Sequence, residues 1–251
     1  MDRGVPLAFA YCAKGDKFEK MAAQSALTLR EHMPDAVIRT IDPEESLRVF
    51  DRLGGVDIPD AHLMGKSWGG PDMLAPMLAR LAIPLLPRFS DCRRVCWLDC
   101  DTEVRSADIA HLADLDIGGC MVAACRDPVL QAQDRCRHLF IRLGGIRRRC
   151  YKNSGVLLFD MERAEGAWEP VLASLLETLR TKFRYLRYPD QDALNVCCDV
   201  GRLPQRYNVF AQLLDEDSRT GRYALDRPVV VHYVTPSRRL YVRREEVWGG
   251  R

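Results

Sequence analysis

The chain has 251 residues, of which 47% are hydrophobic and 29% are charged, and its formal net charge is +2. A chain of this length can form one domain with a full hydrophobic core, and the small net charge gives no general attraction to nucleic acid. No apolar run approaches the roughly 20 residues that span a bilayer, and the N-terminal residues lack the pattern of a secretory signal, so we expect a cytoplasmic protein. The ten cysteines show no C-x-x-C spacing, so we expect reduced thiols in the core.

The first part of the chain predicts a βαβ unit. Residues 5–12 form a short apolar run typical of a buried strand, residues 16–33 show the spacing of an amphipathic helix, and residues 37–41 predict a second strand. Residues 43–71, rich in Gly, Asp and Pro, predict a long irregular excursion. Residues 72–86 predict a helix that its prolines kink or shorten.

The later elements complete an α/β domain. Residues 94–98, 121–125 and 156–159 have the composition of buried strands, residues 168–183 predict an amphipathic helix, and residues 229–232 predict a last strand. Strands that alternate with helices favour a mostly parallel sheet. We therefore expect one α/β domain without internal repeats.

Two carboxylates follow the apolar segment CWLDCDTEV. Residues two apart in a strand project from the same side, so we expect Asp99 and Asp101 to lie together while Cys100 points away. Two neighbouring anions repel unless a cation or a proton lies between them. His232 ends another predicted strand, and ligands of open α/β sheets bind beyond the carboxyl ends of the strands. Oxygen and nitrogen ligands suit Mn²⁺ or Mg²⁺, whereas the alternative is a solvated strand end with a core histidine.

Two basic segments permit more than one interpretation. Residues 135–149 are typical of a solvated face, and contact with an acceptor that bears phosphates is the alternative. Residues 241–251 form a basic C-terminal tail, for which we expect at most peripheral contact with the inner face of a membrane.

Five motifs follow one another along the chain: MLARLAIPLLPRFSDCRRVCWLDCDTEV, YKNSGVLLFDM, YPDQDALN, LPQRYN and VVVHYVTPSRR. In this order they resemble glycosyltransferase family 8, the glycogenin-like and lipopolysaccharide-galactosyltransferase-like family, over about residues 5–240. The resemblance implies a GT-A fold, a Rossmann-like, mostly parallel twisted sheet flanked by helices in a single domain. It further implies a UDP-sugar donor with glucose or galactose, Mn²⁺ or alternatively Mg²⁺, retained anomeric configuration, and a glycan or lipid-linked glycan acceptor, as in lipopolysaccharide or surface polysaccharide synthesis.

The resemblance also implies a division of the chain and roles for its residues. About 5–105 would form the nucleotide-sugar half and about 106–240 the sugar and acceptor half of one domain spanning 1–251. Asp190 and Gln191 would lie nearest the anomeric carbon, and Asp127 would face the sugar or acceptor. The metal ligands would be Asp99, Asp101 and His232, and the donor would contact Ala10, Tyr11, Arg80, Asp99, Cys100, Asn153, Ser154, Asp190 and Arg238, with Gly155 completing the N-S-G segment.

Some residues depart from the family pattern and leave alternatives open. Thr235 replaces a glycine, Arg238 replaces a lysine, and Ser154 replaces an alanine. One alternative is a nucleotide-sugar-binding relative without efficient turnover. Another is a haloacid-dehalogenase-type phosphatase, although that pattern requires Thr or Val where Glu103 stands. Retention by a covalent intermediate and retention by same-face attack both remain open, and Asp190 and Arg80 have a helix cap and a surface charge as their alternatives.

Overall fold

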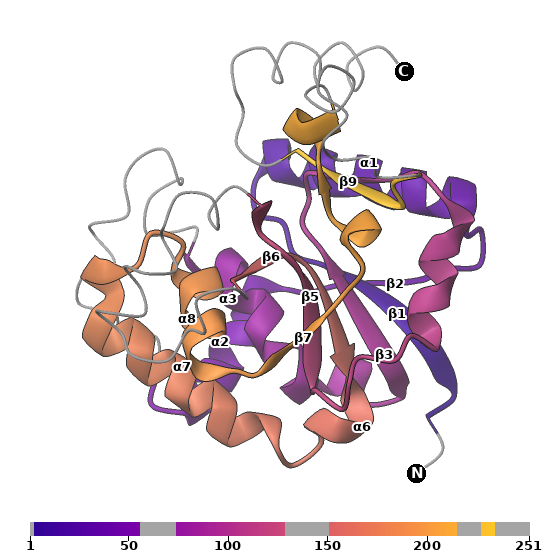
Figure 1. Ribbon diagram of the computed structural model, residues 1–251. Coiled ribbons are helices and arrows are strands. Elements are labelled where there is room, and N and C mark those ends of the chain that lie inside the picture. The colour runs from indigo at the N-terminus through magenta and orange to yellow at the C-terminus, as the bar shows by residue number, and fades with distance from the viewer. Residues whose placement is uncertain (1–2, 56–73, 129–150, 215–226, 234–251) are drawn as a thin grey trace.

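A six-stranded sheet forms the centre of the computed structural model, which describes residues 3–55, 74–128, 151–214 and 227–233 (Figure 1). Its order is β2-β1-β3-β6-β5-β7. Every strand except β6 points the same way, because β6 pairs antiparallel with both β3 and β5. The expectation of a mostly parallel sheet is confirmed. In order across the sheet, the strands are Val37–Thr40, Val5–Tyr11, Cys92–Leu98, Lys152–Asp160, Val122–Arg126 and Val200–Arg202.

Helices cover both faces of this sheet, which explains why its strands are apolar on both sides. On β1, Ala8 and Ala10 face the core shared with α2, α3, α7 and α8, whereas Phe9 faces the core shared with α1. Figure 1 shows α2, α3, α7 and α8 grouped on one side of the sheet and α1 apart from them. The helices are α1 (Asp16–His32), α2 (Pro43–Arg52), α3 (Leu74–Ala82), the short α6 (Met161–Ala164), α7 (Trp168–Lys182) and α8 (Pro189–Cys197).

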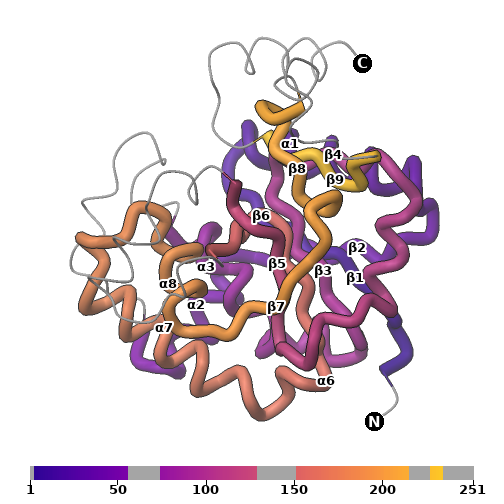
Figure 2. Tube along the Cα trace, viewed as in Figure 1, coloured from indigo at the N-terminus to yellow at the C-terminus, as the bar shows by residue number. Residues whose placement is uncertain are grey.

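A second, smaller sheet lies at one end of the large one (Figure 2). It has the order β4-β9-β8, with β4 at Thr102–Val104, β9 at Val230–His232 and β8 at Val209–Phe210. β9 pairs antiparallel with β4, which sets His232 opposite Thr102. Of these strands only β9 is predicted from the sequence, because it lies in the apolar run VVVH, whereas β4 contains a charged residue and β8 has two residues.

The expectation for residues 43–71 needs correction, whereas that for residues 72–86 does not. Residues 43–71 were expected to be irregular, yet Pro43–Arg52 is a helix: the Asp42 side chain caps it by accepting from the Glu44 amide at 2.9 Å, and proline occupies its first turn. The remainder of that stretch lies outside the described residues. In 72–86 the expected shortening by proline is confirmed: the described helix ends at Ala82, and a 3₁₀ turn, Ile83–Leu85, contains Pro84.

The cysteines are only partly in the core. Cys12, Cys92, Cys96 and Cys125 are buried, whereas Cys100, Cys120, Cys197 and Cys198 are half-buried, and all of these described cysteines are free thiols. None of the helices in the described part of the chain is long and apolar enough to cross a membrane. The basic run 135–149, the tail 241–251, Thr235 and Arg238 lie outside the described residues.

Candidate functional site

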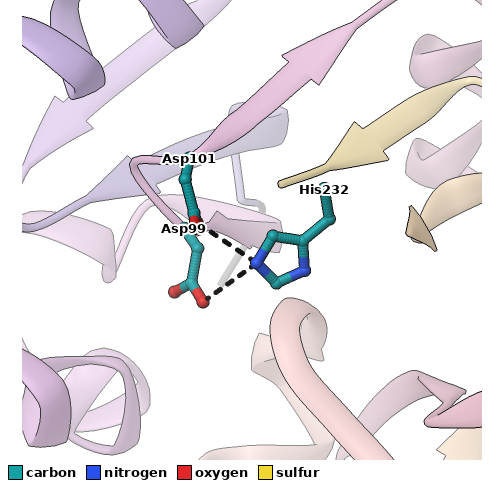
Figure 3. A group of neighbouring side chains, drawn as sticks. All are labelled: Asp99, Asp101 and His232. Atoms are coloured by element: carbon teal, nitrogen blue, oxygen red, sulfur yellow. Dashed lines mark ion pairs between the residues drawn. The ribbon is translucent and has the colours of Figure 1, made fainter. Parts of the chain in front are cut away.

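Asp99, Asp101 and His232 converge beyond the end of β3 (Figure 3). The His232 Nε2 atom lies 3.2 Å from Asp101 Oδ1 and 3.6 Å from Asp99 Oδ2. One potential ligand atom from each residue can be chosen so that all lie within 4.8 Å of one another. The predicted cluster is therefore formed, with two carboxylate oxygens and one imidazole nitrogen facing a common point.

A turn brings the two carboxylates together. The expectation that Asp99 and Asp101 project from the same side of one strand is therefore wrong. β3 ends at Leu98, and the next residues turn into β4, held by the Thr102 amide and hydroxyl, which donate to the Asp99 carbonyl at 3.1 and 2.8 Å. Cys100 does point away, because its thiol donates to the Cys12 carbonyl at 3.2 Å. The pairing of β4 with β9 then brings His232 to this turn.

The electrostatics of the cluster favour a bound cation or a retained proton. Burial raises the pKa of the Asp99 carboxyl, against the lowering effect of Arg80 and His232. Burial alone would lower the pKa of His232, but the neighbouring Asp101 and Asp99 carboxylates outweigh it and the pKa is raised. A divalent ion would replace that proton, and this oxygen and nitrogen donor set fits Mn²⁺ or Mg²⁺ with coordination positions left for a substrate.

Arg80 is buried beside the cluster, so the interpretation as a surface charge is wrong. One terminal nitrogen lies 3.0 Å from Asp99 Oδ1, and Nε lies 3.4 Å from Asp190 Oδ2. Trp97 supports both partners: its Nε1 donates to Asp99 Oδ1 at 2.8 Å, and its ring lies 4.8 Å from the guanidinium carbon. The two carboxylates outweigh burial and raise the pKa of Arg80, which therefore stays charged. Asp99 Oδ1 is thus held by Arg80 and Trp97, whereas Oδ2 faces His232.

The predicted sugar-binding residues form one buried network at the start of β6 and of α8. Ser154 donates from Oγ to Asp190 Oδ2 at 2.9 Å and from its amide to Gln191 Oε1 at 2.9 Å. Asp127 Oδ2 accepts from Asn153 Nδ2 at 3.2 Å and from Gln191 Nε2 at 3.3 Å. The network therefore brings together residues that lie far apart in the sequence.

Asp190 is not the cap of α8. The N-cap residue is Tyr188, and Asp190 lies in the first turn with its side chain directed to Ser154 and Arg80. Asp192 instead satisfies backbone amides that precede the helix, because its Oδ2 accepts from the amides of Arg187 and Tyr188 at 2.7 and 3.1 Å.

Ala10 and Tyr11 of β1, both predicted to contact the donor, have different surroundings. Ala10 is fully buried in the core. The Tyr11 hydroxyl lies 3.1 Å from Ser25 Oγ, which lies 2.9 Å from Thr102 Oγ1, so the chain of hydroxyls ties the turn to α1. Tyr11 also lines a pocket of about 560 Å³ with Thr40 and Asp42, among other residues of α1, β2 and α2.

Sequence reasoning missed several residues that shape the site. Trp97, Tyr151 and Asn208 each share a hydrogen bond with a predicted residue. Asp192 in turn accepts from the Tyr151 hydroxyl. Asn208 ends the LPQRYN motif, and that motif was the signal available, although its spacing alone assigns no partner.

Comparisons with known proteins bear on the family and the fold. The family described as Glycosyl transferase family 8 matches residues 72–238, and no curated protein sequence matches significantly. LgtC, solved in complex with donor and acceptor sugar analogs, is similar at 19% identity over 97% of this chain and 95% of that chain, with a TM-score of 0.64. The bifunctional glycosyltransferase WbbM is similar at 19% identity over 94% of this chain and 47% of that chain, with a TM-score of 0.64. Mouse xyloside xylosyltransferase 1 is similar at 14% identity over 92% and 98%, with a TM-score of 0.56.

The fold is the GT-A fold that LgtC also has. The chain belongs to glycosyltransferase family 8. The phosphatase alternative is therefore wrong.

Proposed function

We propose that the chain is a metal-dependent, retaining glycosyltransferase that transfers glucose or galactose from a UDP-sugar to a hydroxyl group of a glycan or lipid-linked glycan. The observation that carries this proposal is the convergence of Asp99, Asp101 and His232 next to the buried network of Asp190 and Gln191. Family membership and the similarity to LgtC, whose structure holds donor and acceptor sugar analogs, support it.

Asp99, Asp101 and His232 would hold Mn²⁺ or Mg²⁺. A bound ion supplies a positive charge that neutralises the diphosphate leaving group as the glycosidic bond breaks. Arg80 keeps Asp99 oriented through its 3.0 Å contact, so the carboxylate is preorganised for this task. Arg238 follows β9, and we propose that its guanidinium binds the same diphosphate in a two-pronged geometry.

Asp190, Gln191, Asp127, Asn153 and Ser154 would orient the sugar. All of them are buried, and their hydrogen bonds hold one another in place. A rigid set of donors and acceptors can bind sugar hydroxyls without reorganising. The amide of Gln191 is a poor nucleophile, so it serves binding in either mechanism of retention. We propose residues 5–105 as the nucleotide-sugar half and 106–240 as the sugar and acceptor half.

The proposal is tested by measuring UDP released from UDP-glucose and UDP-galactose in Mn²⁺. Asp101→Asn should lose nearly all turnover while remaining folded by circular dichroism, because the metal loses a charged ligand. Asp114→Asn, at an exposed carboxylate whose side chain is 81% accessible, is the matched control and should keep full turnover. The product linkage should be α when read from its NMR coupling constant.

Full turnover in excess EDTA would contradict the metal dependence, and a β-linked product would contradict retention. If the protein bound a UDP-sugar but released no UDP with any sugar acceptor of a panel, the alternative of a nucleotide-sugar-binding protein without efficient turnover would be favoured.

A further inference from the structure

We propose that Asn208 is a positioning residue of the metal centre, because it determines which ring nitrogen of His232 carries the hydrogen and so keeps the lone pair on Nε2, the nitrogen that faces Asp99 and Asp101. This inference rests on the metal-binding role proposed above and extends it to a residue outside the ligand set. Asn208 immediately precedes β8 and is fully buried.

The argument starts from a backbone amide whose role is unambiguous. The Gly155 N–H donates to Asn153 Oδ1 at 2.9 Å. A peptide N–H can only donate, so this atom of Asn153 must be the amide oxygen. The opposite end of the same side chain, Nδ2, lies 3.2 Å from the Asp127 carboxylate, which accepts. The orientation of the Asn153 amide is therefore determined by its neighbours at both ends.

The orientation of Asn208 follows from that of Asn153. The side-chain nitrogen of Asn208 lies 2.8 Å from Asn153 Oδ1, and only an NH₂ group can donate to that oxygen. The Asn208 oxygen is consequently the atom that faces the histidine.

The tautomer of His232 follows in turn. Asn208 Oδ1 lies 3.0 Å from His232 Nδ1, and an amide oxygen cannot donate, so Nδ1 carries the hydrogen. In the neutral ring Nε2 then has the lone pair, and Nε2 is the atom that lies 3.2 Å from Asp101. This is the tautomer that a metal ligand requires, with its other nitrogen held by an outer partner.

Packing leaves the ring little freedom to escape this arrangement. His232 is 3% exposed, and the edge-to-face contact with Phe210 has a centroid distance of 5.8 Å. A Cβ atom at Gly155 would overlap His232 Cε1, so the ring lies directly on the backbone of β6. Because Asn153 also donates to Gln191 at 3.0 Å, the same relay joins the metal centre to the predicted sugar pocket.

The test measures Mn²⁺ affinity by electron paramagnetic resonance in a series of variants. Asn208→Leu removes the acceptor at similar volume, so the ring can adopt the other tautomer and affinity should fall about 10- to 100-fold. Asn208→Asp keeps an acceptor oxygen beside Nδ1 and should retain most of the affinity. The matched control is Asn195→Leu: the hydrogen bonds of this buried amide go to the Lys152 backbone and the Gln191 carbonyl, so its loss should cost stability and leave Mn²⁺ affinity unchanged.

A second measurement does not depend on any variant folding. In the metal-free native protein, at a pH at which the ring is neutral, ¹⁵N NMR should show Nδ1 protonated and Nε2 unprotonated. A protonated Nε2 would overturn the proposal, and so would unchanged Mn²⁺ affinity in Asn208→Leu or equal losses in both leucine variants. If the native protein binds no Mn²⁺, the proposed metal site fails, and the NMR result still decides the role of Asn208.

Discussion

Arg80 shows how a single residue can connect two parts of a site. It lies between a proposed metal ligand, Asp99, and a proposed sugar-binding residue, Asp190, at 3.0 and 3.4 Å. It also donates to the Ser154 carbonyl and hydroxyl at 2.9 and 3.0 Å. The buried charges are thus compensated only as a group, since any one of them left alone would be costly.

Replacing Arg80 by methionine should therefore destabilise the metal-free protein by about 3–5 kcal/mol, the range for breaking a buried ion pair. The reason is that Asp99 and Asp190 lose their shared cation in a site where water replaces it poorly. Urea unfolding measures the loss. Arg93→Met, which removes a solvent-exposed pair with Asp114, should cost no more than about 1 kcal/mol. Equal losses would show that Arg80 acts as an ordinary surface charge.

At the scale of elements, the site depends on the contact of β6 with β9. Gly155 on β6 has no side chain, and the His232 ring of β9 occupies the space where a Cβ would lie. Position 155 requires glycine because two strands that belong to different sheets approach closely there. The N-S-G segment therefore shapes the metal centre as well as the sugar pocket.

We expect Gly155→Ala to displace the imidazole, to weaken Mn²⁺ binding and to cost about 1–3 kcal/mol of stability, as overpacking does. Gly4→Ala is the control, because a Cβ there meets no atom within 4 Å. Calorimetry with and without Mn²⁺ separates the two effects. Undiminished metal affinity in Gly155→Ala would contradict the proposed contact.

On the scale of the whole molecule, the cluster lies where the two sheets meet. Asp99 follows β3 of the large sheet, whereas His232 ends β9 of the small one. A bound ion would therefore cross-link the two sheets. Its stabilising effect should follow mass action, about 2.7 kcal/mol at a concentration 100 times the dissociation constant.

This effect should depend on pH in a defined direction. Because the folded-state pKa values of His232 and Asp99 are raised, the stability they contribute is present at low pH and is lost as the pH rises through those values. Mn²⁺ requires the deprotonated ligands, so the rise in melting temperature caused by Mn²⁺ over EDTA should grow as the pH rises through the raised pKa values of these ligands. His232→Gln should abolish most of this increase. A constant increase across that range would contradict the coupling between proton and metal.

The sequence by itself determined much of the local structure and the membership of the site. Strands β1, β3 and β9 and helices α1 and α7 appear close to their predicted ranges, because buried strands and amphipathic helices have patterns that depend on neighbouring residues alone. The conjunction of Asp99, Asp101 and His232 was predicted correctly, but the expected reason, strand ends that share one edge of a sheet, was not the one found, because the pairing of β4 with β9 in the small sheet brings His232 to the carboxylates.

Only the tertiary structure decided the reversed direction of β6, the small sheet, and the tautomer that the relay imposes on His232. An apolar run is the same in either strand direction, so it cannot reveal its pairing. Helix α2 was missed although Asp42 and Pro43 carried a start signal, because a Gly- and Pro-rich stretch was interpreted as a whole. Asn208 acquires its role from partners on β6 and β9, and pairings between residues so distant in the chain arise only when the chain packs.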